Sequence, residues 1–273
     1  MAKLTLSQRQ VLSRVPGRRQ RDFWWPLSLP LLAFLALPLI ALLARSSLGQ
    51  LWLNLNQPVV YQAISLSLFT STIATAAAIV LGTPLAFLMA RRQFRLKRAV
   101  DTLIDLSTVL PPAVAGVALL MAFGRRGIAG SLLAELGIHI AFAQAAVIMA
   151  QTFIAAPLYL KSAITGFAAV EPELEQSAAL DGASEWNIFR HVTIPLSHRA
   201  LLSGAVLTWA RALGEFGATI IFAGNFPGRT QTMPLAIYIG FELDLDVALT
   251  LSVILMGLSF LTLMLVKVLF QRE

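Results

Sequence analysis

The sequence predicts an all-α integral membrane protein with six transmembrane helices. Of its 273 residues, 57% are hydrophobic and only 13% are charged, whereas soluble domains carry about 25% charged residues. The mean hydropathy of +0.75 leaves too little polar surface to cover a soluble globule. Apolar runs of the roughly 20 residues that cross a bilayer recur along the chain, at residues 24–44, 62–90, 102–123, 141–163, 200–223 and 247–270.

Most lysines and arginines gather on one side of these runs. They crowd the N-terminal tail, the link after the second run from Arg91 to Arg98, the link after the fourth run and the C-terminal end. By the positive-inside rule, both termini and the loop at 170–197 face the cytoplasm. We therefore expect a cytoplasmic basic tail at 1–22 and a transmembrane domain at 23–273. The net charge of +7 reflects this topology, so no nucleic-acid partner is expected.

The first apolar run predicts an uncleaved membrane span. It is longer than the 7–15 apolar residues of a signal peptide, and no small-residue cleavage site follows it. Trp24 and Trp25 would anchor its cytoplasmic end at the membrane interface. At the other end of the sequence, no regulatory domain is expected after the last span, which closes near Phe270.

The third run contains Pro111 and Pro112 at mid-depth. Two prolines remove two backbone donors, so the helix must kink or break there. A broken helix at the membrane midplane often lines a transport pathway, but a purely structural kink is an equal alternative. Asp101 and Asp105 stand near the start of this run, where acids complement the helix dipole.

The fifth run carries Arg211 and Glu215 one helical turn apart, with Thr219 one turn further on. The first two can pair on one helix face. Ionisable residues inside a span are costly and usually face a bundle interior or a wet cavity. The residues alone leave two readings open, a self-neutralising packing pair and a part of a pathway.

Two links are expected on the outer side of the membrane. Residues 124–140 form a loop that could include a short interfacial helix, and residues 224–242 are rich in turn formers. The second link presents Asn225, Arg229 and Thr230. It could be a docking surface, an anion-attracting mouth or a plain loop.

The sequence lacks the signatures of an enzyme or an energy source. It has no cysteine and only three histidines, so no thiolate or clustered metal site is expected. There is no phosphate-binding Gly-rich loop ending in Gly-Lys-Ser/Thr and no inverted repeat of the kind common in secondary transporters. We expect no cofactor, no metal and no catalytic residue. Work on a solute would be powered by another protein.

The loop at 170–197 is the longest polar interruption of the chain. Five of the 14 acids lie in it, and its sequence predicts two short helices, Pro172–Leu180 and 184–191. Asp181 and Gly182 form a turn signal between them. Ser184 is a capping residue, and Pro195 would end the region. A patch of small side chains, in which the groove of another protein could close on the backbone, comprises Ala178, Ala179, Gly182 and Ala183.

This loop resembles the cytoplasmic signature of ABC-importer permeases, E-A-A-x-x-x-G followed by I-x-L-P. Gly182 takes the place of the glycine, and residues 192–195, ending in Pro195, take the place of the second half. The first half departs from the pattern, because Gln176 and Ser177 replace Glu and Ala and Glu175 stands one position early. Residues 210–219 are similar to the span shared by molybdate, tungstate and sulfate permeases, and residues 223–235 are most similar to the molybdate branch.

The resemblance implies the type I ABC-importer architecture in a prokaryotic cell membrane. It implies a homodimer of permeases in the lipid bilayer, two cytoplasmic ATPase subunits, an extracytoplasmic oxyanion-binding protein and alternating access. The residues that it implies for the ATPase-coupling loop are Glu175, Ala178, Ala179, Gly182, Ala183, Ser184 and Pro195. Those for the pathway or gate are Pro111, Pro112, Arg211, Glu215 and Thr219, and those for docking the binding protein are Asn225, Arg229 and Thr230.

Several functions therefore compete at this point. The first is a non-enzymatic permease subunit for molybdate, with tungstate, sulfate or another oxyanion as alternatives. The second is a stand-alone channel or ion-coupled carrier that uses Arg211 and Glu215 as a charge relay. The third is an assembly protein without a pathway, which the polar residues inside the third and fifth runs disfavour.

Overall fold

The computed structural model describes residues 19–270, and every regular element in that range is helical. The chain divides into two compact units, residues 1–47 and 48–273. The first unit contains α2 (Arg19–Arg45). Its stretch Trp24–Arg45 is long and apolar enough to span a membrane and has no fully buried residue. This agrees with the first predicted span. Most of the expected tail at 1–22 lies outside the described residues.

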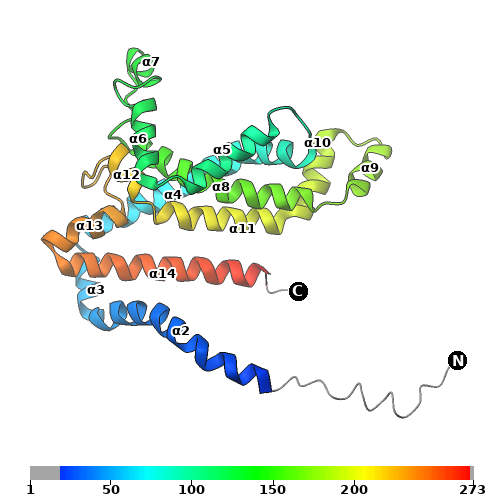
Figure 1. The fold of residues 1–273 in the computed structure, drawn as a ribbon. Coiled ribbons are helices and arrows are strands. Elements are labelled where there is room, and N and C mark those ends of the chain that lie inside the picture. Colours follow the sequence, from blue (N-terminus) through cyan, green and yellow to red (C-terminus); the bar gives the residue numbers. More distant parts are fainter. Residues whose placement is uncertain (1–18, 271–273) are drawn as a thin grey trace, which may run out of the picture. The chain divides into compact units, whose positions relative to one another are not determined.

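Three long helices form the core of the second unit. These are α4 (Pro58–Arg91), α8 (Gln144–Ala168) and α11 (Ile194–Leu213), which run side by side in Figure 1. Small residues allow this close packing, since Ala74, Ala155 and Ala212 meet where the three helices touch. Such contacts hold membrane helices together without a hydrophobic drive.

Three further helices of this unit pack together. The last helix, α14 (Leu245–Phe270), packs on α11 and on the short apolar helix α13 (Met233–Leu243). The short helix α3 (Leu48–Asn54) is fixed to α14 by a hydrogen bond of 2.9 Å from Asn54 Nδ2 to Thr250 Oγ1. The outer link expected at 224–242 therefore contains most of α13, an apolar helix of 11 residues that is too short to cross a membrane alone.

The third apolar run is broken where the two prolines predict it. It forms α5 (Lys97–Val109) and α6 (Pro112–Phe123), which meet at an angle of 118°. Pro112 begins α6, a position where a missing backbone N–H costs nothing because that donor has no helical partner. The break is thus confirmed.

The fifth apolar run is also broken, and no proline marks the position. Helix α11 ends at Leu213, residues 214–216 are non-helical, and α12 (Gly217–Phe222) follows. Four helices in residues 19–270 are long and apolar enough to cross a membrane alone, and the bent pair α5–α6 brings the number to five. The pair α11–α12, which carries His198, Arg199 and Arg211, does not qualify as a broken membrane span by length and apolar composition. The count of six spans therefore stays a prediction.

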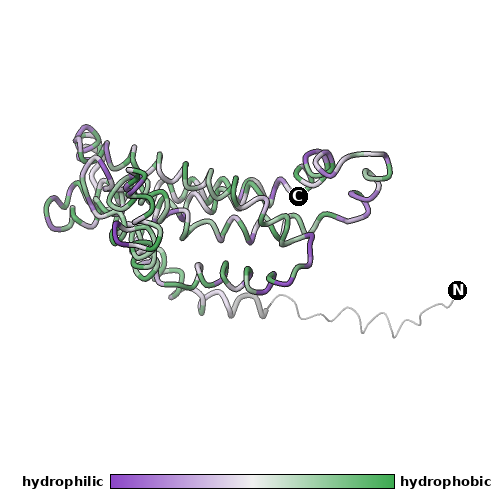
Figure 2. The backbone as a smooth tube through the Cα atoms, turned by 90° about the horizontal axis from the view of Figure 1, so that it is seen from above, coloured by the Kyte–Doolittle hydropathy of each residue, from purple (hydrophilic) through white to green (hydrophobic). Residues whose placement is uncertain are grey.

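The two ends of the second unit differ in character. Figure 1 shows α9 (Pro172–Leu180) and α10 (Glu185–Ile188) at one end, and α6, α12, α13 and the short helix α7 (Gly130–Glu135) at the other. In Figure 2 the loop around α9 and α10 contains hydrophilic stretches, whereas the long helices are mainly hydrophobic or neutral. The unit therefore has the polarity of a membrane bundle with a polar loop at one end, and α7 confirms the short helix expected in 124–140.

Candidate functional site

The polar loop folds much as its sequence predicts. Helix α9 has the predicted bounds, Gly182 has a φ of +85° that favours glycine, and the Ser184 hydroxyl accepts a hydrogen bond of 3.3 Å from the Asn187 backbone N–H at the start of α10. The second predicted helix is instead α10 followed by a π-helical turn, η1 (Phe189–Thr193), which runs directly into α11. Pro195 therefore lies in the first turn of α11, and the prediction that it ends the region is wrong.

Glu175 ties this loop to two long helices. Its Oε1 accepts hydrogen bonds from Arg91 Nη2 at 2.8 Å and from Thr193 Oγ1 at 2.7 Å, and Arg91 also donates to the Val170 carbonyl at 2.9 Å. The side chains of Arg91 and Glu175 are only 15% and 20% exposed. Because Arg91 ends α4 and Thr193 precedes α11, this carboxylate joins α9 to both. We call these three residues, Arg91, Glu175 and Thr193, the polar joint.

Aromatic rings make a second attachment next to the polar joint. Phe189 of η1 lies 4.9 Å from Phe87 of α4 and 6.0 Å from Phe167 of α8, measured between ring centroids. Phe87 and Phe167 also meet edge to face at 5.7 Å. Such pairs contribute about 0.5–1.5 kcal/mol each beyond the area they bury. The loop is therefore attached to the bundle at two points.

The outer face of the loop exposes apolar side chains that the sequence analysis did not single out. Leu180 is 89% exposed and Trp186 is 64% exposed. Around them lie the small residues of the predicted patch, with Ala179, Gly182 and Ser184 exposed and Ala178 and Ala183 half-buried. Large apolar side chains on a polar loop typically mark a protein-docking surface. In the sequence, this exposed apolar face is marked by one apolar residue on each side of the turn, Leu180 before it and Trp186 after it.

The breaks in the third and fifth runs meet at the opposite end of the unit. A Cβ on Gly217 would lie 2.8 Å from the Cβ of Pro112, and a Cβ on Gly116 would lie 2.8 Å from that of Ile221. Helices α6 and α12 are therefore in close backbone contact, which only glycine permits at these two positions. Two of the expected pathway elements thus lie against each other, with Pro112 at the contact and Pro111 exposed beside it.

Arg211 and Glu215 form the predicted pair, although Glu215 lies in the break after α11 and not on the same helix face, and a third group joins them. Arg211 Nη1 lies 2.8 Å from Glu215 Oε2, and the backbone N–H of Ala218 donates to Glu215 Oε1 at 2.8 Å. Glu215 is buried and the Arg211 side chain is 37% exposed. The carboxylate therefore holds Arg211 at the end of α11 and caps the start of α12. Thr219 is fully buried, with no partner for its hydroxyl among the described residues, so it lies within the helix packing in this conformation.

The three residues expected to dock a binding protein lie in different environments. Thr230 is buried, and its hydroxyl accepts a hydrogen bond of 3.0 Å from the Phe226 backbone N–H. Asn225 is half-buried, whereas Arg229 is exposed. Thr230 therefore shapes the turn from inside, and Arg229 is the member of this set that a partner can reach.

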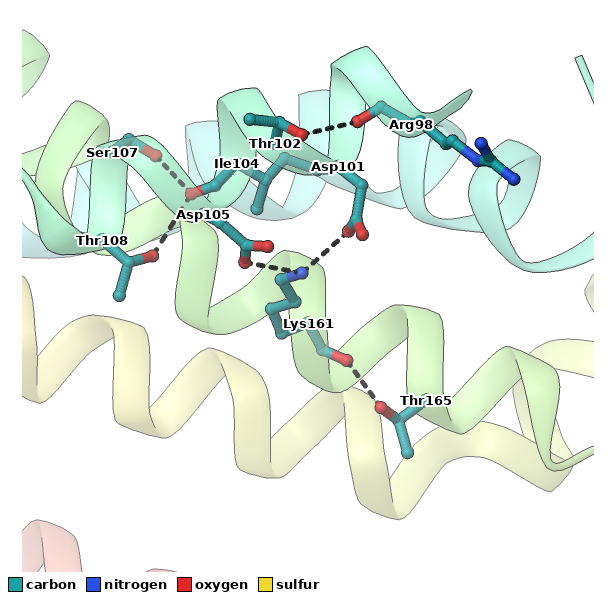
Figure 3. A network of polar contacts seen from close by, with 9 residues as sticks. All are labelled: Arg98, Asp101, Thr102, Ile104, Asp105, Ser107, Thr108, Lys161 and Thr165. Carbon is teal, nitrogen blue, oxygen red and sulfur yellow. Dashed lines mark hydrogen bonds and ion pairs between the residues drawn. The ribbon is translucent and has the colours of Figure 1, made fainter. Parts of the chain in front are cut away.

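One ionic cluster was missed by the sequence analysis. Lys161 Nζ of α8 lies 2.8 Å from Asp101 Oδ1 and 2.8 Å from Asp105 Oδ1 of α5, as Figure 3 shows. The interpretation of the two acids as partners of the helix dipole is wrong, because α5 begins at Lys97 and has no acid in its first turn. Instead they pair with a cation on another helix. Among the described residues, no group of three or more His, Cys, Asp and Glu side chains could hold a metal ion.

Comparison with known proteins identifies a family that this chain matches. The model of a family described as "Binding-protein-dependent transport system inner membrane component" matches residues 82–272. The chain is 43% identical over 225 residues to a molybdenum transport system permease protein of Mycobacterium bovis, covering 82% of this chain and 85% of that protein. It is 39% identical over 179 residues to the molybdenum transport system permease protein of Escherichia coli K12, covering 65% and 78%.

Solved structures share the fold at low sequence identity. A bacterial alginate ABC transporter in complex with its periplasmic protein matches with a TM-score of 0.73 at 16% identity, covering 93% of this chain and 94% of that one. The MetNI methionine ABC transporter matches with a TM-score of 0.55 at 18% identity, covering 82% and 99%. The helical arrangement is therefore that of ABC-importer membrane subunits.

Proposed function

The chain belongs to the family of binding-protein-dependent transport system inner membrane components, and from that premise we propose that it is the permease subunit of an ATP-driven importer for molybdate. The observation that carries the proposal is the polar loop at 170–197, which has an exposed apolar face and two attachments to the bundle. Molybdate is proposed because both relatives described above are named molybdenum transport system permease proteins. The permease itself is not an enzyme.

The proposed assembly has two copies of this chain, two cytoplasmic ATPase subunits and an extracytoplasmic oxyanion-binding protein. Each ATPase subunit would grip the face that contains Leu180, Gly182 and Trp186. When ATP brings the ATPase subunits together, the two loops would move with them. The permease would then switch between two discrete arrangements, one open to each side of the membrane.

The attachments of the loop give this motion a route through the bundle. Because Glu175 bonds to Arg91 and Thr193, a displacement of α9 is passed to α4 and to the start of α11. Arg211 lies in the last turn of α11 and Glu215 just after it, in the break that leads to α12. We propose that the pathway opens and closes at the contact between α6 and α12, where two broken helices can shift without unfolding a continuous span.

A tetrahedral dianion needs hydrogen-bond donors and positive potential along its route. The half-exposed guanidinium of Arg211 could supply both at the contact between α6 and α12, and the exposed Arg229 could attract the anion at the outer mouth. Tungstate and sulfate have the same shape and charge, so the same machinery serves them as alternative substrates. Selection among these anions would belong largely to the binding protein.

A stand-alone ion-coupled carrier is the second candidate. It would use Arg211 and Glu215 as a charge relay, and a relay needs a carboxylate that can exchange partners. Both oxygens of Glu215 are held, one by Arg211 and one by the Ala218 backbone N–H. This favours a fixed positioning role and therefore the importer.

The test is the ATPase activity of the reconstituted complex with the binding protein loaded with molybdate, tungstate or sulfate in turn. Gly182→Arg should abolish the stimulation, because a bulky cation would fill the exposed face of the loop. Gly182→Ala is the matched control, since it has the same unfavourable φ of +85° but adds only a methyl group, which meets no atom within 4 Å.

The outcomes separate the candidates. Stimulation by molybdate that is lost in Gly182→Arg and largely kept in Gly182→Ala supports the proposal. Stimulation by sulfate alone would keep the importer and replace the substrate. If no ATPase subunit associates and the chain alone carries molybdate into liposomes without ATP, the carrier is correct.

A further inference from the structure

The link between α4 and α5 carries an excess of positive charge. Its residues from Arg92 to Arg98 include four cations and no acid. Arg92 Nη2 lies 3.6 Å from Glu185 Oε1 on an exposed surface, whereas Arg95 and Arg98 are exposed and form no ion pair with any residue in 19–270. Two guanidinium groups of this link therefore lack a counter-charge within the described part of the chain.

A hollow of about 660 Å³ lies beside this link, between the end of α4, the start of α5 and the last turns of α8. We call it the basic hollow. Its cations are Arg95, Lys97 and Arg98, and its apolar lining includes Met89, Phe94 and Ile164. Positive charges and apolar side chains thus line the same space.

Asp101 also lines the basic hollow, but it does not neutralise these cations. Its carboxylate already lies 2.8 Å from Lys161 Nζ, and Figure 3 shows the Arg98 side chain pointing away from both residues. Lys97 Nζ donates to the Arg92 carbonyl at 3.4 Å, which is a neutral acceptor. Because neighbouring cations repel one another, an anion bound among them would stabilise this end of the bundle.

The basic hollow lies at the ends of helices that cross the membrane. Helix α4 ends at Arg91, α5 begins at Lys97 and α8 ends at Ala168, and both α4 and α8 are long and apolar enough to span a bilayer. Leu96 and Leu103, in the link and in α5, are 67% and 66% exposed, so apolar surface continues from the cations along α5. Lipid headgroups surround such helix ends, and a lipid reaches them from the bilayer without passing through the protein.

We propose that the basic hollow binds the headgroup of an anionic phospholipid. Its phosphate lies against Arg95, Lys97 and Arg98, and its acyl chains cover Leu96 and Leu103. Basic pockets at the ends of membrane helices recognise anionic headgroups in this way. A small free anion would satisfy the cations but leave the apolar lining and the exposed leucines uncovered. The inference goes beyond the proposed function, since it requires a membrane around the chain but no particular transported substrate.

The bound lipid would also support the polar loop. The same link holds Arg92, which pairs with Glu185 of α10, and it directly follows Arg91 of the polar joint. A lipid that neutralises the link would steady both connections. Phosphatidylglycerol added to the full complex in detergent should therefore raise its melting temperature by several degrees, and phosphatidylcholine, which has no net charge, should not.

The binding test uses native mass spectrometry of the full complex, with phosphatidylglycerol as the probe. Arg95→Gln with Arg98→Gln should weaken the tightest phosphatidylglycerol site at least fivefold and remove the rise in melting temperature. Arg95→Lys with Arg98→Lys keeps the charges and should bind within about twofold of the unmodified complex. Arg125→Gln with Arg126→Gln is the matched control, because it removes the same charge from two exposed residues of the link at 124–140, and it should bind normally.

Three results would overturn the lipid site. The first is equal phosphatidylglycerol binding by the unmodified complex and the Arg95→Gln, Arg98→Gln variant. The second is an equal rise in melting temperature with millimolar inorganic phosphate, which would assign the hollow to a free anion. The third is loss of the ATPase subunit from the variant while phosphatidylglycerol still binds, which would assign these cations to a protein contact.

Failure of the proposed function is a separate result. If no loaded binding protein stimulates the ATPase activity of the unmodified complex, the importer is overturned. The lipid site still stands in that case, provided that phosphatidylglycerol binding depends on Arg95 and Arg98.

Discussion

At the scale of single residues, Glu175 of the predicted coupling loop is held inside the protein. It does not point outward to a partner but accepts hydrogen bonds from Arg91 and Thr193 inside the protein. A carboxylate shared by two donors fixes their relative positions, and each hydrogen bond to a charged group contributes about 1.5–3 kcal/mol. The departure of the leading acid from the family pattern is therefore compatible with a working loop.

Glu175→Gln should loosen the connection between α9 and the bundle. We expect a lower melting temperature of the purified complex and fewer anions transported per ATP hydrolysed, because the loop would follow the ATPase subunits without moving α4 and α11 fully. Glu173→Gln, on the same helix and exposed, should change neither quantity. Equal behaviour of the two variants would show that the polar joint does not transmit motion.

Glu215 is the second residue that positions others. In Glu215→Gln the amide oxygen can still accept from the Ala218 backbone N–H, but Arg211 loses its counter-charge. The free energy of unfolding should fall by roughly 1–3 kcal/mol, since Arg211 is partly exposed to solvent. Glu185→Gln, which removes a 3.6 Å ion pair with Arg92 on an exposed surface, is the control and should leave the melting temperature unchanged. A similar melting temperature for both variants would contradict the positioning role.

At the scale of elements, local chemistry was predicted well and distant pairing was not. The break at Pro111 and Pro112, the turn at Gly182 and the cap at Ser184 follow from the residues themselves. The pairing of Lys161 with Asp101 joins positions 60 residues apart, and no local pattern encodes it. The break at 214–216 has no proline to mark it, and there Glu215 accepts a hydrogen bond from the Ala218 backbone N–H.

The contact between α6 and α12 can be tested with two glycines. Gly116→Ala places a methyl group 2.8 Å from the Cβ of Ile221 and 2.9 Å from the Ala218 carbonyl oxygen. The melting temperature should fall, since overpacking costs about 1–3 kcal/mol. Gly257→Ala on α14 is matched in chemistry and meets nothing within 4 Å, so it should be neutral or slightly stabilising. A neutral Gly116→Ala would mean that the two half-helices are not closely packed.

At the scale of the whole molecule, the second unit contains every candidate site discussed above, and the described part of the first unit is a single span. None of residues 24–45 is fully buried inside the chain. Replacing them with an unrelated apolar span of equal length keeps the topology and should retain import within about twofold, because lipid can cover either helix. Loss of import together with loss of the dimer would show that this helix binds the second copy.

The π-helical turn at Phe189–Thr193 matters for anyone who recombines permeases. It holds one more residue per turn than the helices on either side, so it sets the rotational phase between the loop and α11. A chimera joined after Phe189 with one residue fewer would turn α10 by about 100° relative to α11, which would move Phe189 away from its ring contacts with Phe87 and Phe167. Such exchanges should therefore keep all five residues of η1 together. The number of residues in this segment matters more for the orientation of the loop than their identities.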